Sequence, residues 1–224
     1  CTVNTTVTVQ QITMGAFTGT LDFATNDNNV TLQTFSGTGT GARVLNMGDG
    51  LWLLTSFNAN VWDVTTGTNF TLNANASTLS FIPSSTPTGS INFVGGGKSY
   101  NTVTHSGVTN QQALVISGSP TIATFTITAP ANVLFSVGTT TTISNAPSWT
   151  GTSTNQLFLG SGSTTGVATV VLSAAGGITQ WAAIRGLTVT TNALMATNSF
   201  DLKGNTLVTI TPPSTGGGAR IISG

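Results

Sequence analysis

Residues with the chemistry for acid–base catalysis are few in this chain: five Asp, no Glu, one His and one Cys. Glycoside hydrolysis normally needs two carboxyl groups that face one cleft, about 5 to 10 Å apart. Asp49 and Asp63 are the best candidates for such a pair, because stacked coils could bring their 14-residue spacing onto one face. Trp52 and Trp62 stand close to them in the sequence, and an indole beside an acid is typical of a sugar platform. These four residues form our candidate carbohydrate-contacting set.

A structural interpretation of the same residues is simpler, and we favour it. Asp49 lies between two glycines, which is a turn sequence. Asp63 follows Trp62 in an alternating run, where its side chain would point to solvent. Trp52 and Trp62, with the other two Trp and the eleven Phe, are expected mainly to fill an aromatic core. We therefore predict that the chain has no catalytic residue and is not an enzyme.

Two further features resemble sites and lack essential parts of them. Lys98 and Ser99 follow three glycines, but a phosphate loop needs Gly where Asn92 stands and a helix afterwards, whereas residues 100–104 look like a strand. His105 is the only His, and without Cys or acid partners it cannot build a usual zinc site. We expect a glycine turn at the first feature and a surface or turn histidine at the second. The sequence predicts no metal and no cofactor.

Charged residues make up only 4% of the chain, against roughly 25% in an average soluble protein. The formal net charge is zero and the five basic residues stand singly, which gives no electrostatic footprint for nucleic acid or anionic lipid. No apolar run approaches the roughly 18 residues of a membrane helix. We predict no nucleic-acid partner and no membrane insertion. A surface so poor in charge favours packing against copies of itself or within a larger particle.

Cys1 is the only cysteine, so an intrachain disulfide is impossible. Its position at the start has two interpretations. Cys1 is either the lipidated first residue of a bacterial lipoprotein after signal removal, or simply the start of a trimmed piece of a longer chain. The residues that follow already look like a strand, which favours the trimmed piece.

Helix formers are scarce and β-branched residues abound, which predicts an all-β protein. Many runs alternate apolar and polar residues, as at 124–128 and 208–211, the pattern of a strand with one buried face. The strand-like runs are 7–13, 29–35, 43–47, 51–56, 61–64, 70–73, 78–82, 91–94, 113–116, 123–128, 133–137, 156–159, 167–172, 187–191 and 206–211. Residues 84–90 and 144–154 look like loops.

Two short sequences recur along the chain: Thr-Gly-Thr at 18–20, 38–40, 66–68 and 150–152, and Asn-Ala-Asn at 58–60 and 73–75. Their spacing of about 15 to 20 residues predicts a parallel β-helix or β-solenoid of stacked coils. Stacking would place like residues over like, so that Thr and Asn form hydrogen-bonded ladders. The alternative is an antiparallel β-sandwich or jelly roll, but the Asn-Gly hairpin signal is absent.

No linker divides the chain. We expect a single repetitive β domain at residues 1–211, followed by a Pro/Gly-rich tail or connector at 212–224.

Six stretches follow one another in order over most of the chain: 41–52, 60–64, 70–74, 92–101, 133–142 and 178–181. The most recognisable is Asn-Phe-Val-Gly-Gly-Gly-Lys-Ser-Tyr-Asn at 92–101. Together they resemble a family of repetitive, β-helix-like bacteriophage virion proteins of the tail-fibre, spike or head-decoration type. The resemblance implies a parallel β-helix-like virion part, and it brings no catalytic motif with it.

The expected function is therefore that of a non-enzymatic virion structural protein, a fibre, spike or capsid decoration, that mediates assembly or host-surface attachment. Expected partners are other virion proteins, copies of the chain itself as a homo-oligomer, and host surface polysaccharide. Two alternatives stay open. One is a polysaccharide-degrading tailspike that uses Asp49 and Asp63. The other is a bacterial surface adhesin or extracellular filament subunit, at the cell surface, which a lipidated Cys1 would favour.

Overall fold

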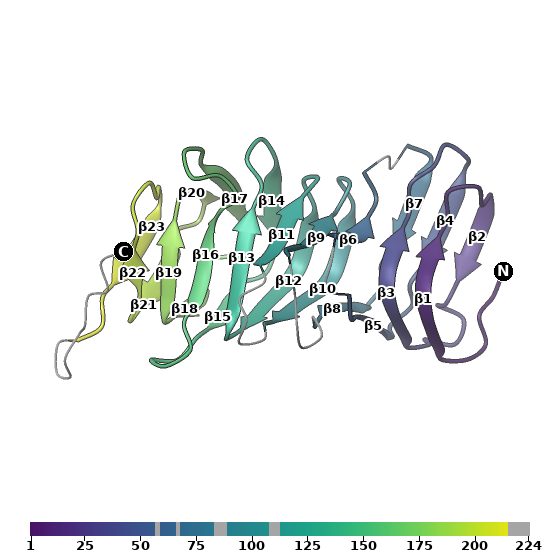
Figure 1. Ribbon diagram of the computed structural model, residues 1–224, viewed down its shortest axis with the longest axis horizontal. Coiled ribbons are helices and arrows are strands. Elements are labelled where there is room, and N and C mark those ends of the chain that lie inside the picture. The colour runs from purple at the N-terminus through teal and green to yellow at the C-terminus, as the bar shows by residue number, and fades with distance from the viewer. Residues whose placement is uncertain (57–58, 66–67, 83–88, 108–112, 215–224) are drawn as a thin grey trace.

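A computed structural model describes residues 1–56, 59–65, 68–82, 89–107 and 113–214. The chain winds into an elongated solenoid whose strands lie across the long axis, with the N-terminus at one end (Figure 1). Every strand pair among the described residues is parallel, as the pairing of β1 with β3 and of β21 with β23 illustrates. The predicted parallel β-helix is thus confirmed, and the antiparallel sandwich alternative is wrong.

The described segments are strands and turns, and none of them forms a helix with the length and apolar character needed to cross a bilayer. The first strands are β1 (Val7–Thr13), β2 (Gly19–Asp22), β3 (Val30–Ser36), β4 (Arg43–Asn46), β5 (Leu51–Leu54), β6 (Ala59–Asp63), β7 (Phe70–Asn73), β8 (Thr78–Phe81), β9 (Ile91–Val94), β10 (Ser99–Ser106), β11 (Ala113–Ser117) and β12 (Thr121–Thr128). The others are β13 (Ala131–Phe135), β14 (Thr140–Ile143), β15 (Ser148–Thr150), β16 (Leu157–Ser161), β17 (Ala168–Leu172), β18 (Ile178–Gln180), β19 (Ala182–Arg185), β20 (Leu187–Thr191), β21 (Leu194–Thr197), β22 (Phe200–Asp201) and β23 (Val208–Thr211).

Strands of successive coils pair in three stacks that run along the solenoid. The first stack holds β2, β4 and β7, which form a sheet of their own. Toward the C-terminal end β14, β17 and β20 pair with one another, and β14 also pairs with the beginning of β12. The second runs through β5, β8, β10 and β12 to β15, β18, β21 and β23. The third runs through β6, β9, β11, β13, β16, β19 and β22. The long strand β3 spans the second and third stacks, since it pairs with both β5 and β6.

The coils are longer and less regular than the recurring tripeptides predict. Asn73 pairs with Asn46, 27 residues earlier, and Thr104 pairs with Ser80, 24 residues earlier. The predicted period of about 15 to 20 residues fits only part of the solenoid, such as the pairing of Thr197 with Gln180 and of Thr188 with Thr169. It is wrong for the longer coils, because the turns between strands add different lengths to each coil. The Thr-Gly-Thr at 66–68 and the Asn-Ala-Asn at 58–60 lie partly outside the described residues.

The expected polar ladders do form at several register positions. The amide Nδ2 of Asn73 donates to Oδ1 of Asn46 at 2.7 Å, and Nδ2 of Asn92 donates to Oδ1 of Asn60 at 2.9 Å. Each of these amides thus meets the amide of the coil before it. Side-chain pairing of this kind uses polar groups without adding charge, which fits a Thr- and Asn-rich chain.

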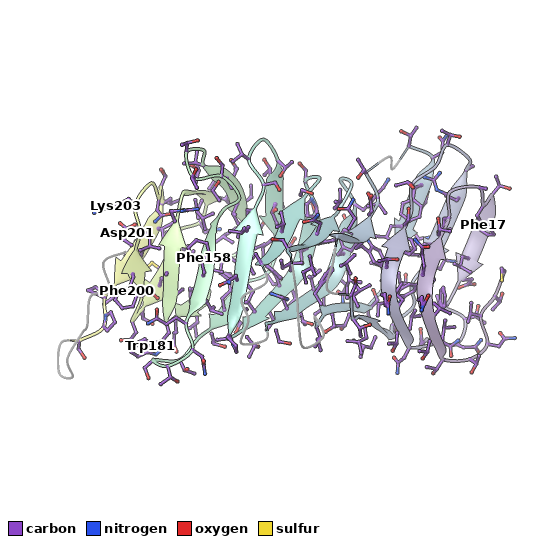
Figure 2. All side chains as sticks on the ribbon, viewed as in Figure 1. Phe17, Phe158, Trp181, Phe200, Asp201 and Lys203 are labelled. Atoms are coloured by element: carbon purple, nitrogen blue, oxygen red, sulfur yellow. The ribbon has the colours of Figure 1, made fainter. Side chains whose placement is uncertain are left out.

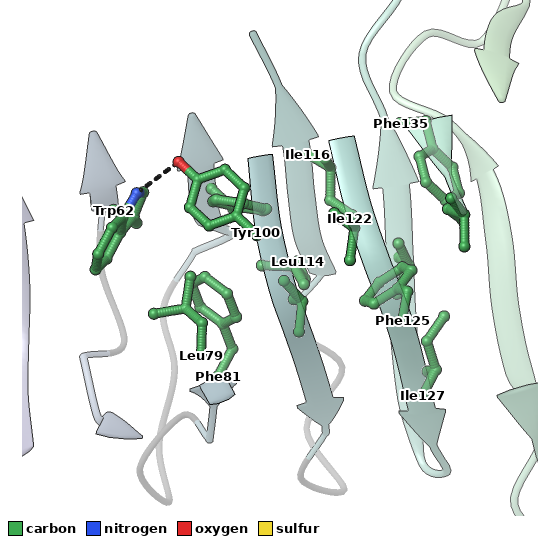
Figure 3. Packing of buried hydrophobic residues seen from close by; sticks show 14 of the residues in the cluster. Trp62, Leu79, Phe81, Tyr100, Leu114, Ile116, Ile122, Phe125, Ile127 and Phe135 are labelled. Carbon is green, nitrogen blue, oxygen red and sulfur yellow. Dashed lines mark hydrogen bonds between the residues drawn. The ribbon is translucent and has the colours of Figure 1, made fainter. Parts of the chain in front are cut away.

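Large apolar side chains fill the space between the three stacks (Figure 3). The rings of Phe35 and Trp62 are stacked with centroids 4.2 Å apart, and Trp52 meets Trp62 edge-on at 6.0 Å. Nε1 of Trp62 donates a 2.9 Å hydrogen bond to the hydroxyl of Tyr100, which in turn donates to the carbonyl of Gly95. Burial raises the pKa of the Tyr100 hydroxyl. This part of the core is thus a column of aromatic rings in which the indole N–H of Trp62 and the hydroxyl of Tyr100 are hydrogen-bonded.

Most predicted strand-like runs coincide with strands, but several strands were missed. β2 and β14 lie in Thr- and Gly-rich segments with little apolar signal. β15 lies inside the segment 144–154 that we predicted to be a loop, and its Trp149 is buried. Strands follow one another from Val7 to Thr211, and the predicted tail lies outside the described residues from 215 on.

Candidate functional site

Trp52 and Trp62 cannot contact a carbohydrate. Both side chains are 0% exposed, and Nε1 of Trp52 donates to the carbonyl of Met47 while that of Trp62 donates to Tyr100. A sugar platform needs an open ring face, and neither indole offers one. The role predicted for these two residues in carbohydrate contact is therefore wrong, and the alternative interpretation, an aromatic core, is confirmed.

A β-bulge in β6 allows the Trp62 side chain to point into the core. The register between β6 and β9 shifts between Asn60 and Trp62, so the consecutive residues Val61 and Trp62 are both buried. A regular strand would point one of these two side chains outward. A prediction based on strict alternation of buried and exposed side chains is therefore wrong for this strand.

Asp49 and Asp63 do not form a pair on one face. Asp49 lies exposed in the turn between β4 and β5, where its backbone N–H donates to Asp27 and its Oδ1 accepts from the N–H of Ala76 at 3.0 Å. Asp63 ends β6 in the third stack, where its register partner is Ser36. The predicted one-face arrangement is wrong, because the coil in this region is 27 residues long, as the pairing of Asn46 with Asn73 shows, and the two acids are only 14 residues apart.

The carboxylate of Asp63 stabilises its own turn. Oδ1 accepts hydrogen bonds from the backbone N–H and the hydroxyl of Thr65, and Oδ2 accepts one from Asn60 at 3.1 Å. Both candidate acids thus have structural partners. Their contact with a carbohydrate stays a prediction.

His105 is buried, so the predicted surface or turn position is wrong. It lies on the inward side of β10 together with Val103, two residues earlier, and it is 1% exposed. Nδ1 lies 3.1 Å from the carbonyl oxygen of Phe81. Burial lowers the pKa of His105 to about 4. Residues two apart in a strand lie on the same face, so the apolar Val103 was the signal that could have placed the His105 side chain in the core.

The glycines before Lys98 form a turn between β9 and β10. The N–H of Gly95 donates to the carbonyl of Ser117 at 2.9 Å, and the N–H of Gly97 donates to that of Gly118. These amides are therefore engaged by the next coil, and a strand follows where a phosphate loop needs a helix. The interpretation of this segment as a glycine turn is confirmed.

A hollow of about 210 Å³ lies near the C-terminal end of the solenoid. The loop between β16 and β17 forms one side, and the turns after β19 and β22 form the other. The residues that matter most for its chemistry are Ser163, Thr165, Arg185, Leu202 and Lys203. Sequence reasoning missed this site, because its three segments come together only through the register of the last coils.

The hollow gathers two of the few cations of the chain. Of the five basic residues, Arg43 is buried and donates to the carbonyl groups of its own loop, and Lys98 lies over the ring of Phe70. Arg220 lies outside the described residues. Arg185 and Lys203 are left, and both line the hollow. Arg43 and Lys98 also lie near each other, both over the ring of Phe70, but Arg43 is buried there.

Together these observations define a parallel β-solenoid protein with a small basic hollow near one end. Among the residues that the structure describes, no group of three or more His, Cys, Asp or Glu could hold a metal ion. No family model matches the chain, and comparison with curated proteins and with solved structures gives no significant match.

Proposed function

We propose that the chain is a non-enzymatic structural protein of a bacteriophage virion, a fibre, spike or capsid decoration. The observation that carries this proposal is a parallel solenoid built from an almost uncharged sequence. Such a rod offers long lateral faces of Thr, Ser and Asn, which suit packing in a particle and contact with a host surface. The sequence resemblance to repetitive phage virion proteins adds support.

The tailspike alternative has lost its main support. It depends on Asp49 and Asp63 acting together, but Asp49 lies in the turn between β4 and β5 while Asp63 ends β6, and the two stabilise different turns. The adhesin or filament alternative shares every fold feature with the virion proposal. The place where the chain is found, in the virion or at the bacterial surface, therefore distinguishes the virion proposal from the adhesin or filament alternative.

The test is to purify phage particles by density gradient from a lysate of cells that carry this gene, and to search for the chain by mass spectrometry. Immunogold labelling then places it on the particle. We expect a fixed copy number per virion, with a host envelope protein absent from the same fraction as control. Recovery of the chain only in the bacterial envelope, with a diacylglyceryl mass on Cys1, would overturn the proposal in favour of the adhesin.

A further inference from the structure

We propose that the basic hollow is a binding site for a sugar acid, whose carboxylate lies between Arg185 and Lys203. This inference deepens the proposed function, because an acidic sugar unit is a natural part of a host surface polysaccharide. The inference rests on the proposed function only in naming a host surface polysaccharide as the source of the sugar acid. Four features of the hollow carry it.

Arg185 is a half-buried cation with an unsatisfied donor. Its Nε is buried, and no described residue accepts a hydrogen bond from it. Its guanidinium carbon lies 5.7 Å from the ring centroid of Phe158, which holds the group in place. A buried polar donor without an acceptor costs free energy. Because Nε itself is covered, a carboxylate in the hollow would bind at the terminal amino groups of Arg185, which the contact with Phe158 holds in place.

Lys203 occupies a backbone conformation that does not favour lysine. Its φ is +79°, a region that Gly and Asn tolerate best, and Gly204 follows with φ +73°. Local propensity alone would therefore select another residue at this turn. Eight other non-Gly residues of the described chain, Thr191 and Leu207 among them, also have a positive φ, so this conformation is common in the turns of the solenoid. At this turn it places a positive charge at the wall of the hollow.

The acid nearest in sequence supports the turn. Oδ1 of Asp201 accepts the backbone N–H of Lys203 at 2.8 Å and the amide of Asn205 at 2.7 Å. Figure 2 shows Asp201 and Lys203 together at the C-terminal end of the solenoid. No ion pair with any described residue neutralises Lys203 or Arg185. Both positive charges are therefore left for a ligand.

The remaining walls suit a sugar ring. Ser163 accepts hydrogen bonds from the N–H groups of Thr165 and Gly166, which orders a loop that carries several hydroxyl groups. Val167 and Leu202 add apolar surface and are 49% and 45% exposed. Hydroxyl and apolar walls together match the two kinds of surface of a sugar. A volume of about 210 Å³ is smaller than the roughly 300–1,000 Å³ of pockets for drug-sized ligands, so it suits a single sugar unit.

The experiment is calorimetric titration of the purified chain with sodium glucuronate, with glucose as the neutral match and sodium sulfate as the inorganic anion. We expect glucuronate to bind, glucose to bind far more weakly, and affinity to fall as salt is added. Lys203→Asn should weaken glucuronate binding about tenfold or more. This variant should keep or raise the thermal midpoint, since Asn tolerates positive φ. Lys203→Arg should retain binding.

Two more variants sharpen the result. Arg185→Gln should also lose binding, and Lys98→Gln, which removes one positive charge elsewhere, should leave it unchanged. If Arg185→Gln does not fold, Lys203→Asn still decides. Absence of glucuronate binding, equal binding of glucose, or equal binding of sulfate would each overturn the sugar-acid assignment. Because the titration uses no particles, its failure is distinct from absence of the chain from virions.

Discussion

Nδ1 of His105 lies 3.1 Å from the carbonyl oxygen of Phe81, its register partner one coil earlier. Nε2 of the same ring is buried and has no hydrogen-bond partner among the described residues. On the other side, His105 pairs with Ile127, so the imidazole is one layer of an apolar column. Burial lowers the pKa of this ring to about 4, and in the folded protein it is neutral near neutral pH.

The free energy of unfolding should therefore fall on mild acidification. An unfolded histidine titrates near 6.5, so between pH 6.5 and about 4 the unfolded chain binds a proton that the folded chain does not. The contribution of His105 is complete above pH 6.5 and is lost as the pH approaches 4, about 3 kcal/mol in all. Urea unfolding at a series of pH values measures this slope. His105→Leu should flatten it, and an unchanged slope in that variant would contradict the assignment.

The Trp62–Tyr100 hydrogen bond should contribute to stability mainly because both groups are buried. Tyr100→Phe leaves the indole N–H of Trp62 and the carbonyl of Gly95 without this partner, and we expect a loss of about 1–3 kcal/mol. The control is Trp62→Phe, in whose background Tyr100→Phe should cost less because no indole donor is left unpaired. Equal costs in both backgrounds, measured by urea unfolding, would show that the hydrogen bond has no such role.

The fold class could be predicted because the alternation of apolar and polar residues within a single strand shows which face of that strand is buried. In β12, Phe125 and Ile127 are buried while Thr124 and Thr126 are less so, as alternation predicts. The coil length could not be predicted, because it depends on the turns. Register partners such as Asn60 and Asn92 lie 32 residues apart, and no local pattern fixes that number.

Two glycines with positive φ should respond differently to Ala. At Gly138, with φ +78°, a Cβ would meet nothing within 4 Å, so Gly138→Ala should cost only the backbone strain, about 1 kcal/mol. At Gly96, with φ +58°, a Cβ would also meet the carbonyl oxygen of Val64. We expect Gly96→Ala to cost a further 1–3 kcal/mol or so, roughly the cost of overpacking. Comparable thermal midpoints for the two variants would contradict this difference.

The acids should not hydrolyse a polysaccharide. Incubation of the chain with capsule or lipopolysaccharide from the host should release no new reducing ends, because Asp49 and Asp63 are not aligned in register. Asp63→Asn and Asp27→Asn should behave like the original chain in this assay. Release of reducing ends that Asp63→Asn abolishes and Asp27→Asn does not would reinstate the tailspike alternative.

The site could be predicted from sequence less well than the fold. The closeness of Trp52 and Trp62 to acids in the sequence predicted a sugar platform, but a bulge between Asn60 and Trp62 lets the Trp62 side chain point inward. The basic hollow joins Arg185 to Lys203 across the turns of neighbouring coils, together with a loop that begins at Ser163. Such a site depends on three-dimensional register, and single residues in the sequence give no sign of it.

Strands of the solenoid run across its long axis, so the hydrogen bonds between coils run along it (Figure 1). A pulling force between the two ends therefore loads the interfaces between coils one after another, and the weakest interface decides where the rod opens. The strand pairs that make up these interfaces range from two residue pairs between β19 and β22 to seven between β10 and β12. Under tension the interface with the fewest backbone hydrogen bonds in total should open first, while coils joined by longer strands still hold. A molecule built this way yields gradually to mechanical load and keeps most of its length intact.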